Sequence, residues 1–364
     1  MAALENPFTP TFGEIPAHLA GRRFIIQNIG KALNSSRRRP ELTTIFSGAR
    51  GTGKTTLLAL IAEQAEQLGW ITASVTAMPG MLEDIEIRVR KSAAHLLKTS
   101  ANTRISSIGI PQVLDIEFNA SEDQPNNWRS RMDDILASLE AQDSGLLITV
   151  DEVDVSLDEM VQLAAIYQHF VREGKKVALI MAGLPNNISA LTSDKTVSFL
   201  RRAEMVHLGR IDNYEIEDAL RKTISEGGRN ASSTDIQQAA EAIDGFPFML
   251  QLVGFRSWEE HPDNNSISSE DFENGIKIAR EEMRARIFES TYRELSEADI
   301  SFLNAMLPDN GDSKIADIQE RLEWSSSQTA QYRRRLIDAG IIGERRRGVI
   351  AFDMPFFREF LQEE

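Results

Sequence analysis

The chain contains a glycine-rich segment whose residue types and spacing could hold phosphate. It reads Gly48-Ala49-Arg50-Gly51-Thr52-Gly53-Lys54-Thr55 and fits the P-loop pattern G-x-x-x-x-G-K-[ST] at every constrained position. Glycines let backbone N–H groups curl around an anion, the lysine reaches the β- and γ-phosphates, and the threonine hydroxyl can ligate Mg²⁺. The alternative is a strand-to-helix turn without a ligand. The predicted nucleotide contacts are Gly48, Ala49, Arg50, Gly51, Thr52, Gly53, Lys54, Thr55 and Thr56.

Two acids follow an apolar run at 146–150 and form the second candidate group. A buried strand that ends in an acid places a carboxylate at the C-terminal edge of a sheet, where a P-loop also lies. We expect Asp151 to hold Mg²⁺ together with Thr55, and Glu152 to act as the general base on the attacking water. The alternative is that Glu152 and Asp154 cap the next helix. The Asp-Glu pair favours hydrolysis over binding alone.

A parallel sheet is the element that would bring these groups together. From residue 43 onward, short apolar runs alternate with helical patterns, as in a sheet with crossover helices. A helix is expected from the glycine-rich turn to about residue 68. The pattern predicts an α/β fold with strands at 43–47, 70–76, 146–150, 177–182 and 205–208.

A long insertion separates the second and third predicted strands, at about 79–143. It is too long for a connecting loop, so we expect it to have its own function, such as contact with a partner or with DNA. Its pattern predicts a helix at 82–98, a hairpin-like run at 105–118 and a helix at 128–140.

Beyond residue 211 the strand signal fades and amphipathic helices dominate. We expect three domains: a core at 1–210, a helical lid at 211–290 and a final domain at 291–364. The lid helices are predicted at 213–226, 233–243, 248–260 and from the capping residues at 268–271 to about 287. The final domain is predicted to have helices at 297–306, 315–322 and 326–339, followed by strands at 341–345 and 348–352.

The distribution of charge restricts any contact with nucleic acid to one region. The 364 residues include 40 Lys and Arg against 55 Asp and Glu, a net charge of -15, so the bulk charge repels nucleic acid. Between residues 331 and 358, however, seven arginines outnumber three acids, a local balance of +4. Contact with a protein is the alternative to contact with duplex DNA in this region. The candidate DNA contacts are Gln328 and Arg333 on a helix and Arg345, Arg346 and Arg347 at a hairpin turn.

The P-loop, the Asp-Glu strand end, the helical block and the terminal helix-and-hairpin pattern together resemble the AAA+ ATPases, in particular their origin-recognition-type and STAND branches. This resemblance implies ATP and Mg²⁺ as ligands, a terminal winged-helix domain and a homo-oligomer. The stretch from residue 6 through residue 22 is similar to the segment that those families place ahead of the first strand, where it borders the adenine.

The resemblance also implies roles for residues outside the P-loop. Asn186 is the nearest candidate for sensing the γ-phosphate, although an ordinary turn asparagine is the alternative. Arg201 and Arg202 precede the fifth strand, where these families place an arginine finger that completes a neighbour's site; a solvated or ion-paired arginine pair is the alternative. Pro247 matches a Gly-x-Pro signature near the base, or simply begins a helix, and Phe248 stands where a sensing arginine is expected.

Composition excludes several other classes of site and sets the expected location. There are no cysteines, which excludes disulfides, thiolate metal sites and a cysteine nucleophile. The first residues lack the pattern of a signal peptide, and the apolar runs are too short to cross a bilayer, so we expect a cytoplasmic protein with no membrane contact. The expected function is a DNA-associated ATPase whose nucleotide state controls a winged helix. The alternatives are a STAND-like regulatory switch whose winged helix binds protein, and a helper of a mobile-element or defence system.

Overall fold

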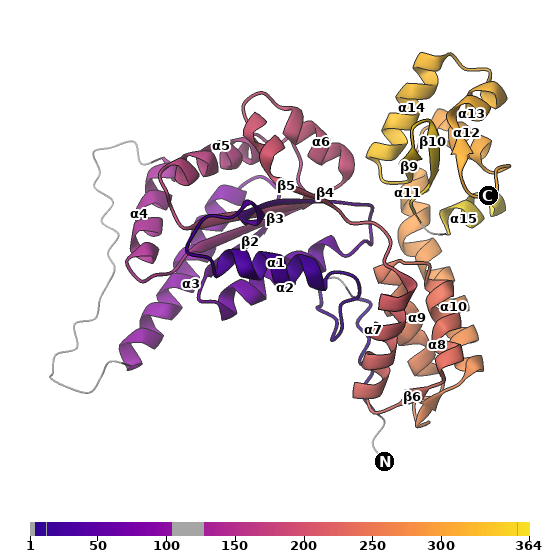
Figure 1. Ribbon diagram of the computed structural model, residues 1–364, viewed down its shortest axis with the longest axis horizontal. Helices are drawn as coiled ribbons and strands as arrows, with labels where there is room; N and C mark the ends of the chain where they lie inside the picture. The colour runs from indigo at the N-terminus through magenta and orange to yellow at the C-terminus, as the bar shows by residue number, and fades with distance from the viewer. Residues whose placement is uncertain (1–3, 12, 104–126, 355) are drawn as a thin grey trace.

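A computed structural model describes residues 4–11, 13–103, 127–354 and 356–364. The chain forms an α/β core that carries the P-loop, a helical bundle, and a C-terminal block of helices around a small sheet (Figure 1). The hairpin expected at 105–118 lies outside the described residues. None of the described helices has the length and apolar character that crossing a bilayer requires.

The core is built on a five-stranded sheet in which all paired strands are parallel, as predicted. The strand order is β2-β3-β4-β1-β5, so the ends of β1 and β3 flank β4 at one edge of the sheet. That edge carries both the P-loop and Asp151. The strands are β1 (Thr43–Ser47), β2 (Ile71–Thr76), β3 (Leu146–Asp151), β4 (Val177–Gly183) and β5 (Glu204–His207).

Helices cover both faces of this sheet, which explains why its central strands are apolar throughout. In β4, Ala178, Ile180 and Ala182 face one apolar cluster and their neighbours face the other. One face is covered by α1 (Arg23–Leu33) and α2 (Lys54–Gln67). The other is covered by α3 (Met81–Thr103), α4 (Trp128–Glu140), α5 (Asp158–Arg172), α6 (Pro185–Ser193) and the 3-10 turn η2 (Ser198–Arg202). A second 3-10 turn, η1 (Pro40–Leu42), leads into β1.

The helical bundle follows the core and agrees with the predicted lid helices except at its end. Its elements are α7 (Asn213–Glu226), β6 (Asn230–Ala231), α8 (Ser233–Ile243), α9 (Pro247–Glu260), β7 (Ser266–Ile267) and α10 (Ser269–Met283). The last helix does not end near residue 287. It continues through a π-helical turn, η3 (Arg284–Phe288), into α11 (Glu289–Arg293). Phe288 lies against Phe357 and Phe360, and this long-range packing favours the continuation.

The C-terminal block has the order helix, strand, helix, helix, strand, strand, helix. Its three short strands pair antiparallel in the order β8-β10-β9. The predicted helices and hairpin are present, and α15 is an additional helix. The elements are α12 (Glu297–Met306), β8 (Ser313–Lys314), α13 (Ile315–Leu322), α14 (Ser326–Asp338), β9 (Ile342–Arg346), β10 (Val349–Phe352) and α15 (Phe357–Glu363).

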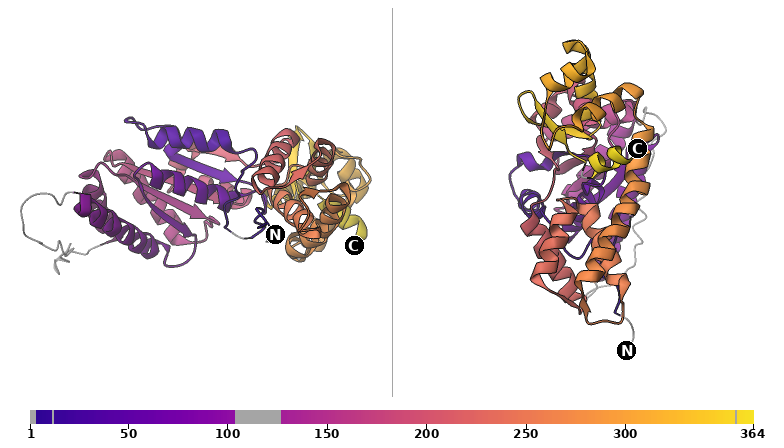
Figure 2. Two further views of the ribbon diagram at one scale, coloured as in Figure 1. Left: turned by 90° about the horizontal axis from the view of Figure 1, so that it is seen from below. Right: turned by 90° about the vertical axis from the view of Figure 1, so that its right-hand side faces the viewer.

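One apolar core joins the bundle to the C-terminal block. A single cluster extends from Ile216 and Trp258 in the bundle to Phe302 and Phe360 in the block, whereas the two faces of the sheet have separate clusters. We call the bundle and the block together the C-terminal body. Figure 1 and the left view of Figure 2 show this body beside the sheet domain rather than over its centre. The body therefore meets the core along a limited boundary, which includes the P-loop.

Candidate functional site

The P-loop connects β1 to α2, and its glycines are required by the path of the backbone. Gly51 and Gly53 have φ values of +80° and +83°, in the left-handed region that glycine adopts without strain. Gly48 is needed for space, because a Cβ there would lie 2.7 Å from the carbonyl oxygen of Leu208. Helix α2 begins at Lys54, so its free N–H groups and the positive end of its dipole face the loop. This geometry suits an anion.

Lys54 adds a positive charge in a buried position. Its side chain is only 6% exposed, and Nζ donates hydrogen bonds of 2.9 Å to the carbonyl oxygens of Gly48 and Ala49. Burial lowers the pKa of Lys54, and the negative charges of Glu152 and Asp151 oppose that shift. The ammonium group is therefore held inside the loop beside two carboxylates.

Asp151 is fixed by hydrogen bonds to both of its carboxylate oxygens. Thr55 Oγ1 donates to Oδ2 at 2.5 Å, and the backbone N–H of Glu152 donates to Oδ1 at 2.9 Å. A hydroxyl oxygen beside a carboxylate is a donor set that suits Mg²⁺, which binds few protein ligands and otherwise takes water and phosphate oxygens. Across the described residues, no three His, Asp or Glu side chains gather closely enough to hold a metal by themselves. Thr55 and Asp151, the predicted magnesium ligands, therefore form a donor set that suits this ion.

Glu152 occupies an unusual backbone conformation directly after β3. Its φ is +52°, in the left-handed region, which is strained for a non-glycine residue and often occurs at functional sites. The side chain is exposed and lines the cavity next to the P-loop. Helix α5 begins only at Asp158, and its N-cap residue Leu157 makes no side-chain cap. Glu152 therefore does not cap this helix, and Asp154 instead accepts a hydrogen bond from the backbone of Ser156.

The cavity at the P-loop has a volume of about 380 Å³, within the usual range for small-molecule sites. The segment that was expected to border the adenine forms one wall, with Thr9, Glu14 and His18 among the lining residues. Thr9 N–H donates to Gln251 Oε1 at 3.0 Å, which ties this wall to α9. Pro247 forms another wall, since a Cβ at Gly53 would lie 3.8 Å from the Cβ of Pro247.

Two arginines that were not singled out as site residues line this cavity. Arg22 is the last residue of the segment expected to border the adenine, and it donates to the carbonyl oxygen of Gly209 at 2.8 Å. Arg286 enters from η3, where its guanidinium also pairs with Glu282 at 2.7 Å. Phe248 lines the cavity where an arginine was expected, and the guanidinium of Arg286 comes from a different segment, η3. No local motif marks Arg286, because it reaches the cavity through the long-range contact of η3 with the P-loop.

The structure does not bring Asn186, Arg201 or Arg202 to the P-loop cavity. Asn186 lies in the first turn of α6 and lines a separate cavity of about 200 Å³. Arg201 and Arg202 are exposed at the end of η2, where Arg201 Nε donates to the carbonyl oxygen of Thr192 at 2.9 Å. Neither arginine forms an ion pair with a residue in the part of the chain that the structure describes.

The proposed DNA contacts lie in different environments. Gln328 is exposed in the first turn of α14, whereas Arg333 is half-buried. Arg345 is not at the tip of the hairpin: it donates to Asp353 at 2.7 Å and to the carbonyl oxygen of Phe352 at 3.1 Å. Arg346 and Arg347, at the turn itself, are exposed and have no ionic partner among the described residues.

Two family models match the sequence. Residues 37–191 match the AAA domain, and residues 285–361 match a "Domain of unknown function (DUF8462)". No curated protein sequence matches this chain.

Similar solved structures cover nearly the whole chain. The Walker-type ATPase PABY2304 of Pyrococcus abyssi has a TM-score of 0.64 and 16% identity over 94% of this chain and 96% of its own. The ORC2 protein of Aeropyrum pernix, in ADPNP-ADP complexes, has a TM-score of 0.63 and 14% identity over 97% of this chain and 96% of its own. Its ADP form has a TM-score of 0.56 and 13% identity over the same shares. With the parallel sheet, the P-loop and the AAA domain match at 37–191, the chain has the fold of the AAA+ P-loop ATPases.

Proposed function

We propose that this protein binds ATP with Mg²⁺ and hydrolyses it, and that its nucleotide state controls a C-terminal winged helix. The observation that carries the proposal is the position of Asp151, which is hydrogen-bonded to Thr55 of the P-loop and directly precedes Glu152 in the same cavity. The nucleotide complexes of the ORC2 protein and the ATPase name of the P. abyssi protein support it. Calorimetry with ADP and with ATP tests the binding step, and a folded protein that binds neither contradicts it.

Each group of residues in the site would have a separate role in ATP binding and hydrolysis. The P-loop N–H groups and Lys54 would bind the phosphates, and Thr55 and Asp151 would hold Mg²⁺, which supplies charge neutralisation to the phosphate oxygens. Glu152 would accept a proton from the attacking water. Pro247 and the segment at 6–22 would enclose the base.

We propose duplex DNA as the partner of the C-terminal block. Its order of helices and strands, with three antiparallel strands and a hairpin, supports the assignment of a winged helix. Gln328 is exposed at the beginning of α14, the helix that would enter the major groove, and Arg346 and Arg347 are exposed at the wing. Base-edge contacts at Gln328 or Arg333 would specify sequence, and the arginines of the wing would contact phosphates.

The double change Arg346→Ala, Arg347→Ala is expected to weaken binding to all duplex sequences. It should also flatten the dependence of log affinity on log salt by roughly one unit for each phosphate that is no longer neutralised. Arg345→Ala is the matched control, because this arginine is paired with Asp353 and should have the smaller effect on the salt slope. Fluorescence anisotropy at two salt concentrations measures both. Wild-type protein without any salt-sensitive affinity for duplex DNA, with or without ATP, would rule out this partner.

A second candidate function is a STAND-like regulatory switch whose winged helix binds a protein. The observation that favours it is that several arginines of the basic region are already engaged within the C-terminal block. Arg335 pairs with Asp299, Arg345 pairs with Asp353, and Arg358 donates to the carbonyl oxygen of Leu307. The electrostatic attraction that these arginines can exert on a DNA phosphate is therefore weaker than the local charge of +4 suggests. The salt titration above separates the two functions.

We also propose that Arg201 and Arg202 act on the site of a neighbouring copy, because both are exposed and remote from their own P-loop cavity. Activity per subunit is then expected to rise with protein concentration. Mixing the double variant Arg201→Ala, Arg202→Ala with Lys54→Ala protein should restore part of the turnover, since a junction can combine an intact P-loop with intact arginines. Steady-state ATPase assays of each protein and of the mixture measure this. Activity independent of concentration, without rescue, would indicate a monomeric switch.

A further inference from the structure

Three consecutive residues at the apex of the P-loop each contact the C-terminal body. Ala49 lies under the corner between α14 and β9, where a Cβ on Gly340 would be 3.0 Å from the Ala49 Cα. Arg50 Nη1 pairs with Glu294 Oε1 at 3.1 Å. Gly51 lies under Phe246, because a Cβ on Gly51 would be 2.6 Å from the ring. We call residues 49–51, the part of the P-loop that the C-terminal body contacts, the seat of the body.

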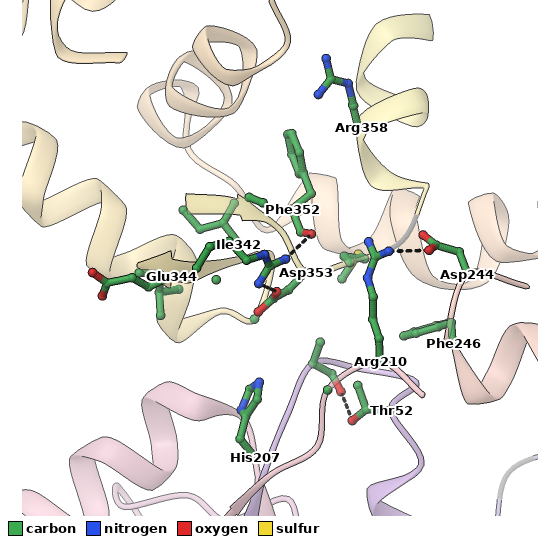
Figure 3. Close-up of a pocket in the computed structure, with 18 of the residues that line it drawn as sticks. Thr52, His207, Arg210, Asp244, Phe246, Ile342, Glu344, Phe352, Asp353 and Arg358 are labelled. Atoms are coloured by element: carbon green, nitrogen blue, oxygen red, sulfur yellow. Dashed lines mark hydrogen bonds and ion pairs between the residues drawn. The ribbon is translucent and has the colours of Figure 1, made fainter. Parts of the chain in front are cut away.

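The boundary around this seat is loosely packed. A cavity of about 710 Å³ lies beside it, and Figure 3 shows Thr52 and His207 of the core on one side and Ile342, Phe352 and Asp353 of the body on the other. The labelled ion pair in this view, between Arg210 and Asp244, joins the segment after β5 to the bundle. Because one apolar core joins the bundle to the block, any change in how the seat holds one of them also affects the other.

Arg50 borders two cavities. Its side chain lines the P-loop cavity of about 380 Å³ and also the cavity of about 200 Å³ that Glu294 and Asp299 line. It is close enough to Lys54 for its charge to lower the pKa of that lysine. The guanidinium pairs with Glu294, and it also borders the cavity that the phosphates proposed for the P-loop would enter. The carboxylate and the phosphates would therefore compete for one guanidinium.

We propose that Arg50 is shared between Glu294 and the phosphates of a bound nucleoside triphosphate, so that triphosphate binding weakens the seating of the C-terminal body on the P-loop. This inference rests on the proposed nucleotide site and adds the residue that couples it to the body. By linkage, the coupling is reciprocal: whatever releases Arg50 from Glu294 strengthens triphosphate binding by the same factor. The pair is partly exposed, so salt reduces the effect.

If Arg50 is shared between Glu294 and the phosphates, substituting the two partners of this ion pair should change the affinity for nucleotide in opposite directions. A purely structural ion pair would not give this result. Glu294→Gln is expected to raise the affinity for Mg²⁺-ADPNP by about two- to fivefold at low salt, because Arg50 is freed for the phosphates. Arg50→Gln is expected to lower that affinity by at least the same factor. Glu289→Gln is the matched control, since it removes the same charge from α11 but pairs with Arg293. Changes of the same sign in both variants, or an equal rise in the control, would overturn the proposal.

The position of the body supplies a readout that does not depend on affinity. Because the chain has no cysteines, spin labels can be placed at Gln67→Cys on α2 and Ser327→Cys on α14, both exposed. Glu294→Gln should shift or broaden the distance distribution without nucleotide, and Mg²⁺-ADPNP should do so in the parent. An unchanged distribution in both cases overturns the coupling alone. Absence of nucleotide binding in the parent overturns the proposed function as well.

Discussion

Lys54→Ala is expected to abolish nucleotide binding, with a loss of affinity of at least about 100-fold. The ammonium group is buried in the loop, within 2.9 Å of the carbonyl oxygens of Gly48 and Ala49, and it faces the same cavity as the free N–H groups of α2. Charge-assisted hydrogen bonds contribute about 1.5–3 kcal/mol each. The loss of two such bonds to the phosphates therefore lowers the affinity by more than about 100-fold. Calorimetric titration with ADP and with ATP measures it.

This substitution also removes two hydrogen bonds inside the protein, so its folding must be measured in parallel. The carbonyl oxygen of Ala49 keeps a hydrogen bond from Thr52 Oγ1, but that of Gly48 loses its Lys54 donor, which costs about 1–3 kcal/mol if water does not replace it. Circular dichroism and thermal denaturation of Lys54→Ala show whether the variant remains folded. Lys31→Ala, at an exposed lysine on α1, removes the same charge from the same domain and should bind normally. A folded Lys54→Ala protein with undiminished affinity would contradict the P-loop assignment.

The features that the sequence predicts well are those that depend on neighbouring residues. The apolar run of β3 is buried on both faces and ends in an acid, so it identifies both a strand and a site. The capping box of Ser268 and Asp271 marks the beginning of α10 in the same way. The P-loop pattern is equally local, since the left-handed backbone at Gly51 and Gly53 requires glycine whatever packs against the loop.

The features that were not predicted depend on contacts between distant segments. Helix α10 continues past residue 287, where Phe288 packs against Phe357 and Phe360, about seventy residues later. Arg286 falls within the predicted helix, but it reaches the cavity only because η3 lies against the P-loop, which is a long-range contact. Arg345 appears in the sequence as one of three equivalent arginines. Its pairing with Asp353 across the hairpin distinguishes it from Arg346 and Arg347. Sequence spacing alone carries no information about such pairings.

Glu152→Gln is expected to retain ATP binding and to lower the turnover number by about 10²–10⁴-fold, the usual contribution of a general base. The amide can still accept a hydrogen bond from water but cannot take its proton. The substitution preserves the size of the side chain, and the left-handed backbone at this position is no more strained for glutamine than for glutamate. Steady-state phosphate release with saturating ATP measures turnover, and calorimetry measures affinity.

Asp154→Asn is the matched control for the charge removed by Glu152→Gln. Asp154 lies two residues later and accepts a hydrogen bond from Ser156, so its neutralisation should leave turnover nearly unchanged. The affinity of Glu152→Gln for ATP should be equal or higher, because a negative charge leaves the cavity that the phosphates would enter. A Glu152→Gln protein that hydrolyses ATP at the parent rate would show that this residue only turns the chain after β3. Loss of both binding and turnover would instead indicate that its carboxylate maintains the charge balance around the buried Lys54.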